Sequence, residues 1–512
     1  MELASSSVVV DIGAASTRVG YAGEGNPCQL LNSCIGVRQR SSFAGDSNAS
    51  GGNENATVRE LIFPLNFSER RDGVEVVPAL FPTWRGPSGK RKGDSSPTYT
   101  LNEEAFENLV ALSCTGARSA RISSSEGATT LDCSGSNDSR AICRSNLRLT
   151  ELCGVGADLR EQPLLLSEPN IHCRGIREKM AEILFEGLQV GSLYTAKRAL
   201  LSCVALGRSS AMVIDVGASG LSIAPVSDSF VLDQHVTEWP VGGDAMSQLL
   251  GSILMGHNLP VHPSFARFSA QGRMSKTAID KPGDWDNVHS SYMHWSRMQT
   301  LSFLKEGLCR VADDPRDVTI ARKPILLPSQ QHQAKRRGGG AAVSPDCPAT
   351  SQLLFPFSTA ASAAALLSSG GGSEGGLMEL PDGTRLEADQ VAMKAVPGGG
   401  GGFPGLPEAV RQVVEAVEAD GNRDILSALV LTGGCSCIPG MVERVNRELV
   451  DDPAVCGGQK VRLLAVPGAQ ERRFSTWVGG SMLASLSSFQ AAWCSREEYE
   501  EHGPAVVQRK CY

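Results

Sequence analysis

Two stretches of the chain combine an acidic residue with a glycine at the end of an apolar run, a pattern that can hold phosphate groups. In the first stretch, VVVDIGAASTRVGYAG (residues 8–23), β-branched residues lead into Asp11 and Gly13. β-Branched residues favour a buried strand, and a glycine in the turn that follows lets the backbone come close to a phosphate. The apolar residues after the turn indicate a returning strand. The stretch therefore predicts a strand, a tight turn and a second strand.

The same pattern recurs in AMVIDVGASGLSIAPV (residues 211–226), where Asp215 and Gly217 follow another apolar run. An ordinary β-turn would explain either hairpin taken alone, but an internal repeat is a stronger signal than a single motif. A third turn contains Gly433 and Gly434, between a predicted strand and a predicted helix. Together, the three turns could surround the phosphates of one nucleotide.

Length and composition limit the class of protein. The 512 residues are enough for two or more domains, and a net charge of −7 gives no electrostatic case for direct nucleic-acid binding. The 15 cysteines are scattered, which favours reduced thiols in a cytosolic or nuclear protein. The first residues show no secretory signal, and no apolar stretch reaches the roughly 18 residues of a membrane-spanning helix.

The remaining periodicity predicts an α/β protein in which ordered segments alternate with insertions. From residue 163 the chain reads as strand, helix, helix and strand, with the second helix expected at 193–206. Further helices are expected at 101–112, 298–311 and 477–493. Four segments are polar or rich in glycine, serine or proline and are expected to form no core, namely 41–57, 113–160, 322–376 and 396–404.

The motifs resemble those of the actin superfamily, most closely its nuclear actin-related proteins. DIGAASTRVGYAGE and MVIDVGASGLSIAPV are similar to the two phosphate loops of actin, and LTGGCSCIPGMVERVNREL is similar to its adenosine-side loop and helix. The ending from ERRFSTWVGGS to QRKCY is similar to the actin C-terminus almost throughout. DIG in place of DNG, the form ERRFSTW, and EEYEEHG point to the actin-related protein 4 subfamily of chromatin remodellers and histone acetyltransferase complexes.

The resemblance implies a fold of two pseudo-repeated α/β domains around a nucleotide cleft. Residues 1–210 would form lobe I and residues 211–424 lobe II, and residues 425–512 would complete lobe II and return to lobe I. The resemblance fails over 41–57 and over 113–160. In the second gap, the helix with which the family packs its smaller domain has no recognisable counterpart.

The resemblance also implies a site for ATP or ADP with Mg²⁺, which Asp11 and Asp215 would hold indirectly. Arg18 stands where actin has a phosphate-contacting lysine, which keeps the charge but changes the geometry. Lys305 and Glu306 would lie against adenosine. The full set of nucleotide-binding candidates is Asp11, Gly13, Arg18, Asp215, Gly217, Gly242, Lys305, Glu306, Gly433, Gly434 and Arg473.

Four positions depart from the family pattern for hydrolysis. Ala218 replaces the aspartate of the second loop, and Arg198 replaces the glutamine that orients water. Ala14 replaces a serine that bonds the terminal phosphate, and Ala15 replaces a glycine. Phosphoryl transfer needs a positioned water and electrostatic help, and the loss of one positioned donor often costs ~10²-fold in rate. We therefore expect ATP binding without appreciable hydrolysis, and no catalytic residue is assigned.

The function that the resemblance implies is a nuclear scaffold subunit that reaches chromatin indirectly. Its partners would be nuclear actin and a long helix of a remodelling ATPase or acetyltransferase scaffold subunit, docked between the C-terminal helix region and residues 424–450. The alternative is a cytoskeletal, filament-forming actin-type ATPase, but residues 41–57 do not resemble the DNase-binding loop of actin. A sugar kinase or chaperone ATPase would share the first loop without the C-terminal ending.

Overall fold

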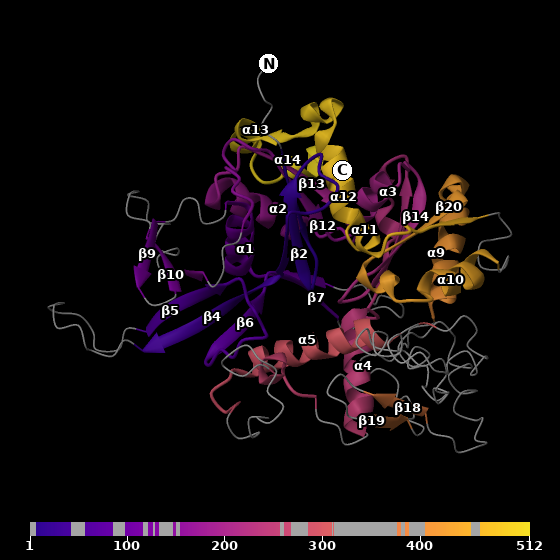
Figure 1. Cartoon of the computed structure of the whole chain (residues 1–512). Coiled ribbons are helices and arrows are strands. Elements are labelled where there is room, and N and C mark those ends of the chain that lie inside the picture. Colours follow the sequence, from indigo (N-terminus) through magenta and orange to yellow (C-terminus); the bar gives the residue numbers. More distant parts are fainter. Residues whose placement is uncertain are drawn as a thin grey trace, which may run out of the picture.

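Three sheets, each of six strands, form the framework of the computed structural model, with helices packed around them (Figure 1). The protein is therefore a mixed α/β structure, as the sequence predicts. The structure describes residues 7–41, 57–84, 98–115, 121–125, 128–132, 147–149, 154–256, 261–267, 285–309, 311, 376–379, 385–388, 405–451 and 461–511. The expectations for the insertions at 41–57, 322–376 and 396–404 lie almost wholly outside these ranges.

The first sheet is built around a buried strand, β1 (Val8–Ile12), which ends at the first phosphate-type turn. β1 pairs antiparallel with β2 (Ser16–Tyr21) and parallel with β12 (Leu164–Glu168). The outer strands are β3 (Gln29–Asn32), β13 (Ser192–Lys197) and β22 (Cys494–Ser495). β22 belongs to the last segment of the chain, so that segment contributes a strand to the first sheet.

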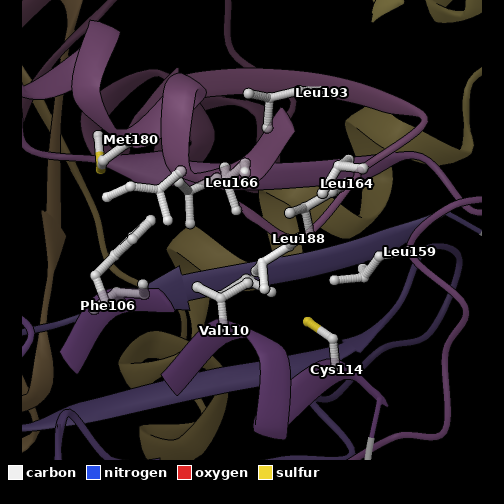
Figure 2. Packing of buried hydrophobic residues seen from close by; sticks show 14 of the residues in the cluster. Phe106, Val110, Cys114, Leu159, Leu164, Leu166, Met180, Leu188 and Leu193 are labelled. Atoms are coloured by element: carbon white, nitrogen blue, oxygen red, sulfur yellow. The ribbon is translucent and has the colours of Figure 1, made fainter. Parts of the chain in front are cut away.

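Two helices cover the first sheet and bury a large apolar core (Figure 2). They are α1 (Glu103–Thr115) and α2 (Arg174–Glu182), the latter continued by a π-helix at Ile183–Gly187. Phe106, Val110 and Cys114 of α1 lie in the same buried cluster as Leu164 and Leu166 of β12. The cluster fills the space between α1 and the first sheet, so α1 packs directly against that sheet.

The expectation that residues 113–160 form no core is wrong at both ends of the segment. Cys114 is fully buried at the end of α1, and Ala157 and Leu159 join the same cluster with 4 and 3 % of their surface exposed. Between them lie β9 (Arg121–Ser125), β10 (Ala128–Asp132) and β11 (Leu147–Leu149). Cys114 continues the buried face of α1, and Ala157 and Leu159 reach the core from the other end of the segment, close to where the ordered chain resumes.

In the second sheet, β4 (Cys34–Ser41) lies between β5 (Thr57–Phe63) and β6 (Val74–Pro78) and pairs antiparallel with both. β11 extends it from β5, followed by β10 and β9. A separate hairpin joins β7 (Leu80–Thr83) to β8 (Thr98–Leu101), which brings the residue range 98–101 next to the first sheet's turns. Residue 101 is therefore in a strand, and the helix expected from residue 101 begins at Glu103.

The third sheet repeats the plan of the first. β14 (Ala211–Val216) pairs antiparallel with β15 (Leu221–Ser227) and parallel with β20 (Ala428–Thr432). β16 (Phe230–Val231), β17 (Thr237–Trp239) and β21 (Arg462–Leu464) complete it. Its core is covered by α4 (Gly243–Gly256), α9 (Leu406–Ala419) and α10 (Met441–Val445). The repeat seen in the sequence is thus a structural repeat, whereas a chain division at residues 210 and 424 stays a prediction.

The C-terminal segment lies beside the first strands of the chain (Figure 1). It contains α11 (Ala469–Arg473), α12 (Ser475–Ser485), α13 (Arg496–His502) and α14 (Val506–Lys510). The helix expected at 477–493 ends at Ser485 and gives way to a 3₁₀ turn at Ser487–Ala492, so its predicted end is wrong. The helix expected at 193–206 is also too long, because residues 192–197 form β13 and only Arg198–Ala205 form the helix α3.

Helix α12 joins α3 to the first sheet through very close packing. Trp477 is fully buried, and its indole Nε1 donates a hydrogen bond of 3.1 Å to the carbonyl oxygen of Val9 in β1. Two residues later, Gly479 faces α3 so closely that a Cβ there would lie 1.8 Å from the carbonyl oxygen of Leu201. Only glycine allows the two helix backbones to approach this far.

A second set of contacts links the second sheet to α5 (Ser290–Leu308). Tyr292 of α5 is fully buried, and its hydroxyl donates to the carbonyl oxygens of Asn66 at 2.9 Å and Glu69 at 2.6 Å. Phe67 stacks on Trp295, with ring centroids 5.9 Å apart. Since α5 also packs against α4, these aromatic contacts tie the second sheet to the helices of the third. None of the described helices has the length and apolarity that crossing a membrane requires.

Gly479→Ala is expected to destabilise the protein, because its Cβ would collide with the backbone of α3. Overpacking against a backbone atom that cannot rotate away costs about 1–3 kcal/mol of the free energy of unfolding. The matched control is Gly175→Ala in α2, where nothing lies within 4 Å of the Cβ position and alanine favours the helix by about 1 kcal/mol. Thermal unfolding midpoints measure both, and a G479A midpoint equal to that of wild type would contradict the close packing of α12 on α3.

Candidate functional site

The three glycine turns open onto one cavity of about 370 Å³ between the first and third sheets. Ten of the eleven residues singled out from the sequence line this cavity, namely Asp11, Gly13, Arg18, Asp215, Gly217, Lys305, Glu306, Gly433, Gly434 and Arg473. Gly242 is the exception. It packs behind the second turn, where a Cβ would lie 2.7 Å from the carbonyl oxygen of Gly217.

The first and second turns close in the same way. In the first, the N–H of Gly13 donates to the carbonyl oxygen of Ser16 at 3.0 Å, and in the second, the N–H of Gly217 donates to that of Gly220 at 2.9 Å. The residues at the tips, Ala14-Ala15 and Ala218-Ser219, line the cavity. A tip of small residues leaves its backbone N–H groups accessible to an anion. The sequence repeat has therefore built two equivalent cradles on opposite sides of one cavity.

The third turn follows β20 and depends on Gly433. This residue has φ +91°, and a Cβ on it would lie 2.4 Å from Oδ1 of Asp215 and 2.5 Å from the carbonyl oxygen of Val216. The strand pair β14–β20 can therefore end side by side only with glycine at this position. Gly434 differs, because no atom lies within 4 Å of a Cβ there. It borders open space in the cavity.

Asp11 lies at the centre of the cavity's charged wall, with only 1 % of its surface exposed. Its Oδ2 accepts a hydrogen bond of 2.6 Å from Nη1 of Arg18, and its Oδ1 accepts one of 2.5 Å from Ser167. The Nε of Arg198 lies 3.8 Å from Oδ1. Burial acts to raise the pKa of Asp11, but the two guanidinium charges and these hydrogen bonds outweigh burial and lower it. The carboxylate is therefore held ionised.

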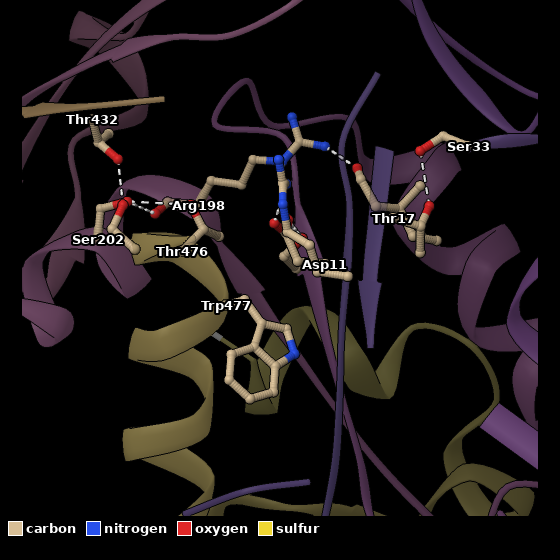
Figure 3. Close-up of polar contacts among 12 residues, drawn as sticks. Asp11, Thr17, Ser33, Arg198, Ser202, Thr432, Thr476 and Trp477 are labelled. Carbon is tan, nitrogen blue, oxygen red and sulfur yellow. Dashed lines mark hydrogen bonds and ion pairs between the residues drawn. The ribbon is translucent and has the colours of Figure 1, made fainter. Parts of the chain in front are cut away.

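Arg198, the first residue of α3, crosses the cavity wall towards β1 (Figure 3). Besides its ion pair with Asp11, its Nη2 donates to the carbonyl oxygen of Ile12. Burial acts to lower the pKa of Arg198, while Asp11 and other neighbouring acidic groups raise it above the usual value. The side chain is therefore a fixed cation beside the first turn.

The second carboxylate, Asp215, is in a different electrostatic environment. Burial raises its pKa, the charge of Arg198 opposes that rise, and the nearby Asp11 adds to it. The two acids that the family resemblance assigns to Mg²⁺ therefore differ, since one is tightly ion-paired and the other is harder to ionise. Within the described part of the chain, no group of three or more acidic, histidine or cysteine side chains is arranged to hold a metal ion.

The remaining candidates are Lys305, Glu306 and Arg473. The ammonium group of Lys305 is buried and donates to the carbonyl oxygen of Gly243 at 2.8 Å and to the hydroxyl of Ser247 at 3.0 Å, so it fixes the start of α4. Glu306 is exposed at the cavity's edge. Of the two arginines in ERR, Arg473 lines the cavity, whereas Arg472 is buried and bonded to backbone carbonyl groups.

Several lining residues were missed by sequence reasoning, among them Tyr99, Asn170 and Glu238. Tyr99 of β8 donates a hydrogen bond of 2.9 Å to the carboxylate of Glu238 in β17. Asn170 donates to the hydroxyl of Ser222 at 2.9 Å and accepts from the N–H of Ala199 at 2.8 Å. Each pair joins segments far apart in the sequence, and none of these residues is flanked by a glycine turn. No local signal could have identified them.

Glu238 is a buried acid on the cavity wall whose pKa is raised mainly by burial. Burial raises its pKa to about 7, and Asp215 adds to the rise, whereas the hydrogen bond from Tyr99 and the charge of Arg198 act against it. An acid whose pKa is raised by folding contributes stability that is complete below its ordinary value of 4.5 and is lost as the pH rises through about 7. The protein therefore loses this contribution towards alkaline pH.

Glu238→Gln is expected to reduce the loss of stability between pH 4.5 and about 7. Glutamine keeps an acceptor for the Tyr99 hydroxyl but never acquires a buried charge. The thermal unfolding midpoint, followed across this pH range, is the measurement. Glu306→Gln is the control, because it removes an exposed carboxylate from the same cavity and should leave the pH profile of wild type unchanged. Identical profiles for wild type and E238Q would contradict this assignment.

Comparison with known proteins agrees with this geometry. The family model described as Actin matches residues 2–512. A protein of Oryza sativa subsp. indica named Actin-related protein 4 is 26 % identical, over 99 % of this chain and 98 % of its own length. Proteins of the same name are 29 % identical in Mycosarcoma maydis, over 99 % of this chain and 98 % of theirs, and 28 % identical in Arabidopsis thaliana, over 69 % and 73 %. Since the family model spans nearly every residue, the chain belongs to the actin family.

Proposed function

We propose that the chain is a nuclear scaffold subunit of a chromatin-remodelling or histone acetyltransferase complex, stabilised by a bound ATP or ADP that it hydrolyses slowly or not at all. The family is one of nucleotide-binding folds, and the relatives compared above carry the name Actin-related protein 4. The proposal has three parts, which are nucleotide binding, the lack of turnover and the docking of a partner.

Nucleotide binding is supported by the composition of the cavity. Its lining comes from both repeated hairpins and from α4, α5 and α11, so one ligand would contact both halves of the repeat. Four cationic side chains line it, namely Arg18, Arg198, Lys305 and Arg473. A nucleotide that binds only the folded chain stabilises it by mass action. It would thereby hold the two lobes together.

The observation that carries the lack of turnover is the position of Arg198. The resemblance places a water-orienting glutamine there, and a glutamine carbonyl can accept a hydrogen bond from an attacking water. A guanidinium has only donors, and this one is already held by Asp11 and by the carbonyl oxygen of Ile12. Ala14 and Ala218 line the cavity with methyl groups where the family pattern has a hydroxyl and a carboxylate. Water would bind there without being activated.

Partner docking is supported by apolar side chains near the end of α12. Met482 has 44 % and Leu486 50 % of its surface exposed. Exposed apolar side chains a turn apart suit the apolar face of an amphipathic helix. We infer that the long helix of a remodelling ATPase or acetyltransferase scaffold subunit packs against them, with nuclear actin as a further partner.

Gly434→Leu tests the nucleotide site. The leucine has room in the fold because nothing lies within 4 Å of its Cβ, but it projects into the cavity that the nucleotide would fill. ATP or ADP should raise the thermal unfolding midpoint of wild type and leave that of the variant unchanged. Gly307→Leu is the matched control, since it is equally unobstructed but does not line the cavity, and it should respond as wild type does. A wild-type midpoint that ignores nucleotide would refute the site.

The double variant M482E/L486E tests the scaffold role. Tagged wild-type chain, purified from nuclei, should bring actin and a remodelling ATPase or acetyltransferase scaffold subunit with it. The double variant should lose the helix-bearing subunit, because two carboxylates would have to be buried without partners. Phe230→Glu is the control, since Phe230 is 52 % exposed on β16 and lies outside the proposed docking site. If wild-type chain instead pelleted as filaments with Mg-ATP and carried neither subunit, the cytoskeletal alternative would be favoured.

A further inference from the structure

We propose that the nucleotide of this cavity binds without Mg²⁺, because Arg18 and Arg198 supply the positive charge that the ion would bring. The inference rests on the proposed function, since it concerns the same nucleotide. It departs from what the family resemblance implies, in which Asp11 and Asp215 hold Mg²⁺ indirectly.

The first observation is that Asp11 already has cationic and hydrogen-bonding partners on both oxygens. Arg18 takes Oδ2 at 2.6 Å, while Ser167 takes Oδ1 at 2.5 Å and the Nε of Arg198 lies 3.8 Å from it. The side chain is only 2 % exposed. A hydrated Mg²⁺ would need an oxygen of this carboxylate to face its water shell. The residues present do not fit the ion at this position.

The second observation concerns donors that lack acceptors. The Nε atoms of Arg18 and Arg198 are buried, and neither has a hydrogen-bond acceptor among the described residues. A buried donor without an acceptor is costly, and an anion is the natural acceptor for a guanidinium. Both side chains line the cavity beside Ala14 and Ala15, the tip of the first turn. A phosphate group of the nucleotide in the cavity would lie beside both guanidinium groups and be attracted by their charge.

The third observation is the balance of charge. Compared with the family pattern, Arg198 stands for a neutral glutamine and adds one positive charge, and Ala218 stands for an aspartate and removes one negative charge. Together these two changes equal the charge of one Mg²⁺. Arg18 keeps the charge of the lysine that it replaces. The side chains of the cavity therefore supply two more units of positive charge than the family pattern does, which is the charge of one Mg²⁺ ion.

The experiment compares the dissociation constants of ATP and ADP for the purified full-length chain in excess EDTA and in excess MgCl₂, by isothermal titration calorimetry. The constants of wild type should agree within about threefold, because the ion adds nothing that the guanidinium groups lack. Arg198→Gln should weaken binding in EDTA by about tenfold or more relative to MgCl₂, a change of about 1.4 kcal/mol. Arg208→Gln, which removes an exposed arginine that does not line the cavity, should behave as wild type.

Arg198→Lys keeps the charge and should keep Mg²⁺-independent binding, which guards against an R198Q variant that fails to fold. Tight binding by wild type in MgCl₂ with a loss of more than tenfold in EDTA would overturn the inference and leave the proposed nucleotide site standing. Absence of binding in both buffers would instead overturn the proposed function. The two failures are therefore distinguishable in one set of titrations.

Discussion

The ion cluster around Asp11 determines how the elements near the cavity are arranged. A carboxylate with 1 % of its surface exposed must be neutralised where it lies, because burial of an unpaired charge is prohibitively costly. Here the neutralising charges come from Arg18 in β2 and Arg198 in α3, and Ser167 in β12 adds a hydrogen bond. These contacts fix the positions of β1, β2, β12 and α3 relative to one another at the edge of the cavity.

Helix α12 supports this cluster from behind. Trp477 bonds the backbone of β1 two residues before Asp11, and Gly479 lets α12 lie directly on the backbone of α3, which carries Arg198. At the base of the cavity, Ser202 of α3 lies 3.3 Å from the hydroxyl of Thr476, and Thr432 of β20 bonds Ser475 (Figure 3). The C-terminal segment thus links the first sheet to the third.

The same cluster connects structure to chemistry. An arginine that neutralises a buried acid cannot also act as a hydrogen-bond acceptor for water. The lack of turnover that we propose would therefore follow from the same contacts of Arg198 that hold β1 and α3 together. The aromatic contacts between Phe67 and α5 join the second sheet to α5.

Much of the fold and most of the site could be predicted because their signals are local. The hairpins at Asp11 and Asp215 can be recognised by an apolar run, an acid and a glycine within a few residues of sequence. The structure brings both turns to one cavity. The helix expected at 193–206 failed in its first part because a strand buried on both faces has the same apolar composition as a buried helix.

Long-range relationships could not be predicted from one sequence. The contact of Tyr99 with Glu238 joins residues 139 positions apart, and the burial of Leu159 depends on α1 rather than on its own neighbours. Likewise, nothing in the spacing of Asp11, Arg18 and Arg198 shows that two guanidinium groups meet one carboxylate. Gly242 was assigned to the ligand by resemblance, but its packing behind Gly217 shows that it supports the turn.

The most direct measurement is the fate of ATP on the purified chain. ATP labelled on its terminal phosphate would be loaded in a single turnover, with conventional actin carried through the same procedure. If the nucleotide holds the lobes together without being consumed, it stays bound and intact, and labelled phosphate does not accumulate. Release of labelled phosphate at or above the rate of conventional actin would contradict that role, whatever the affinity of the site.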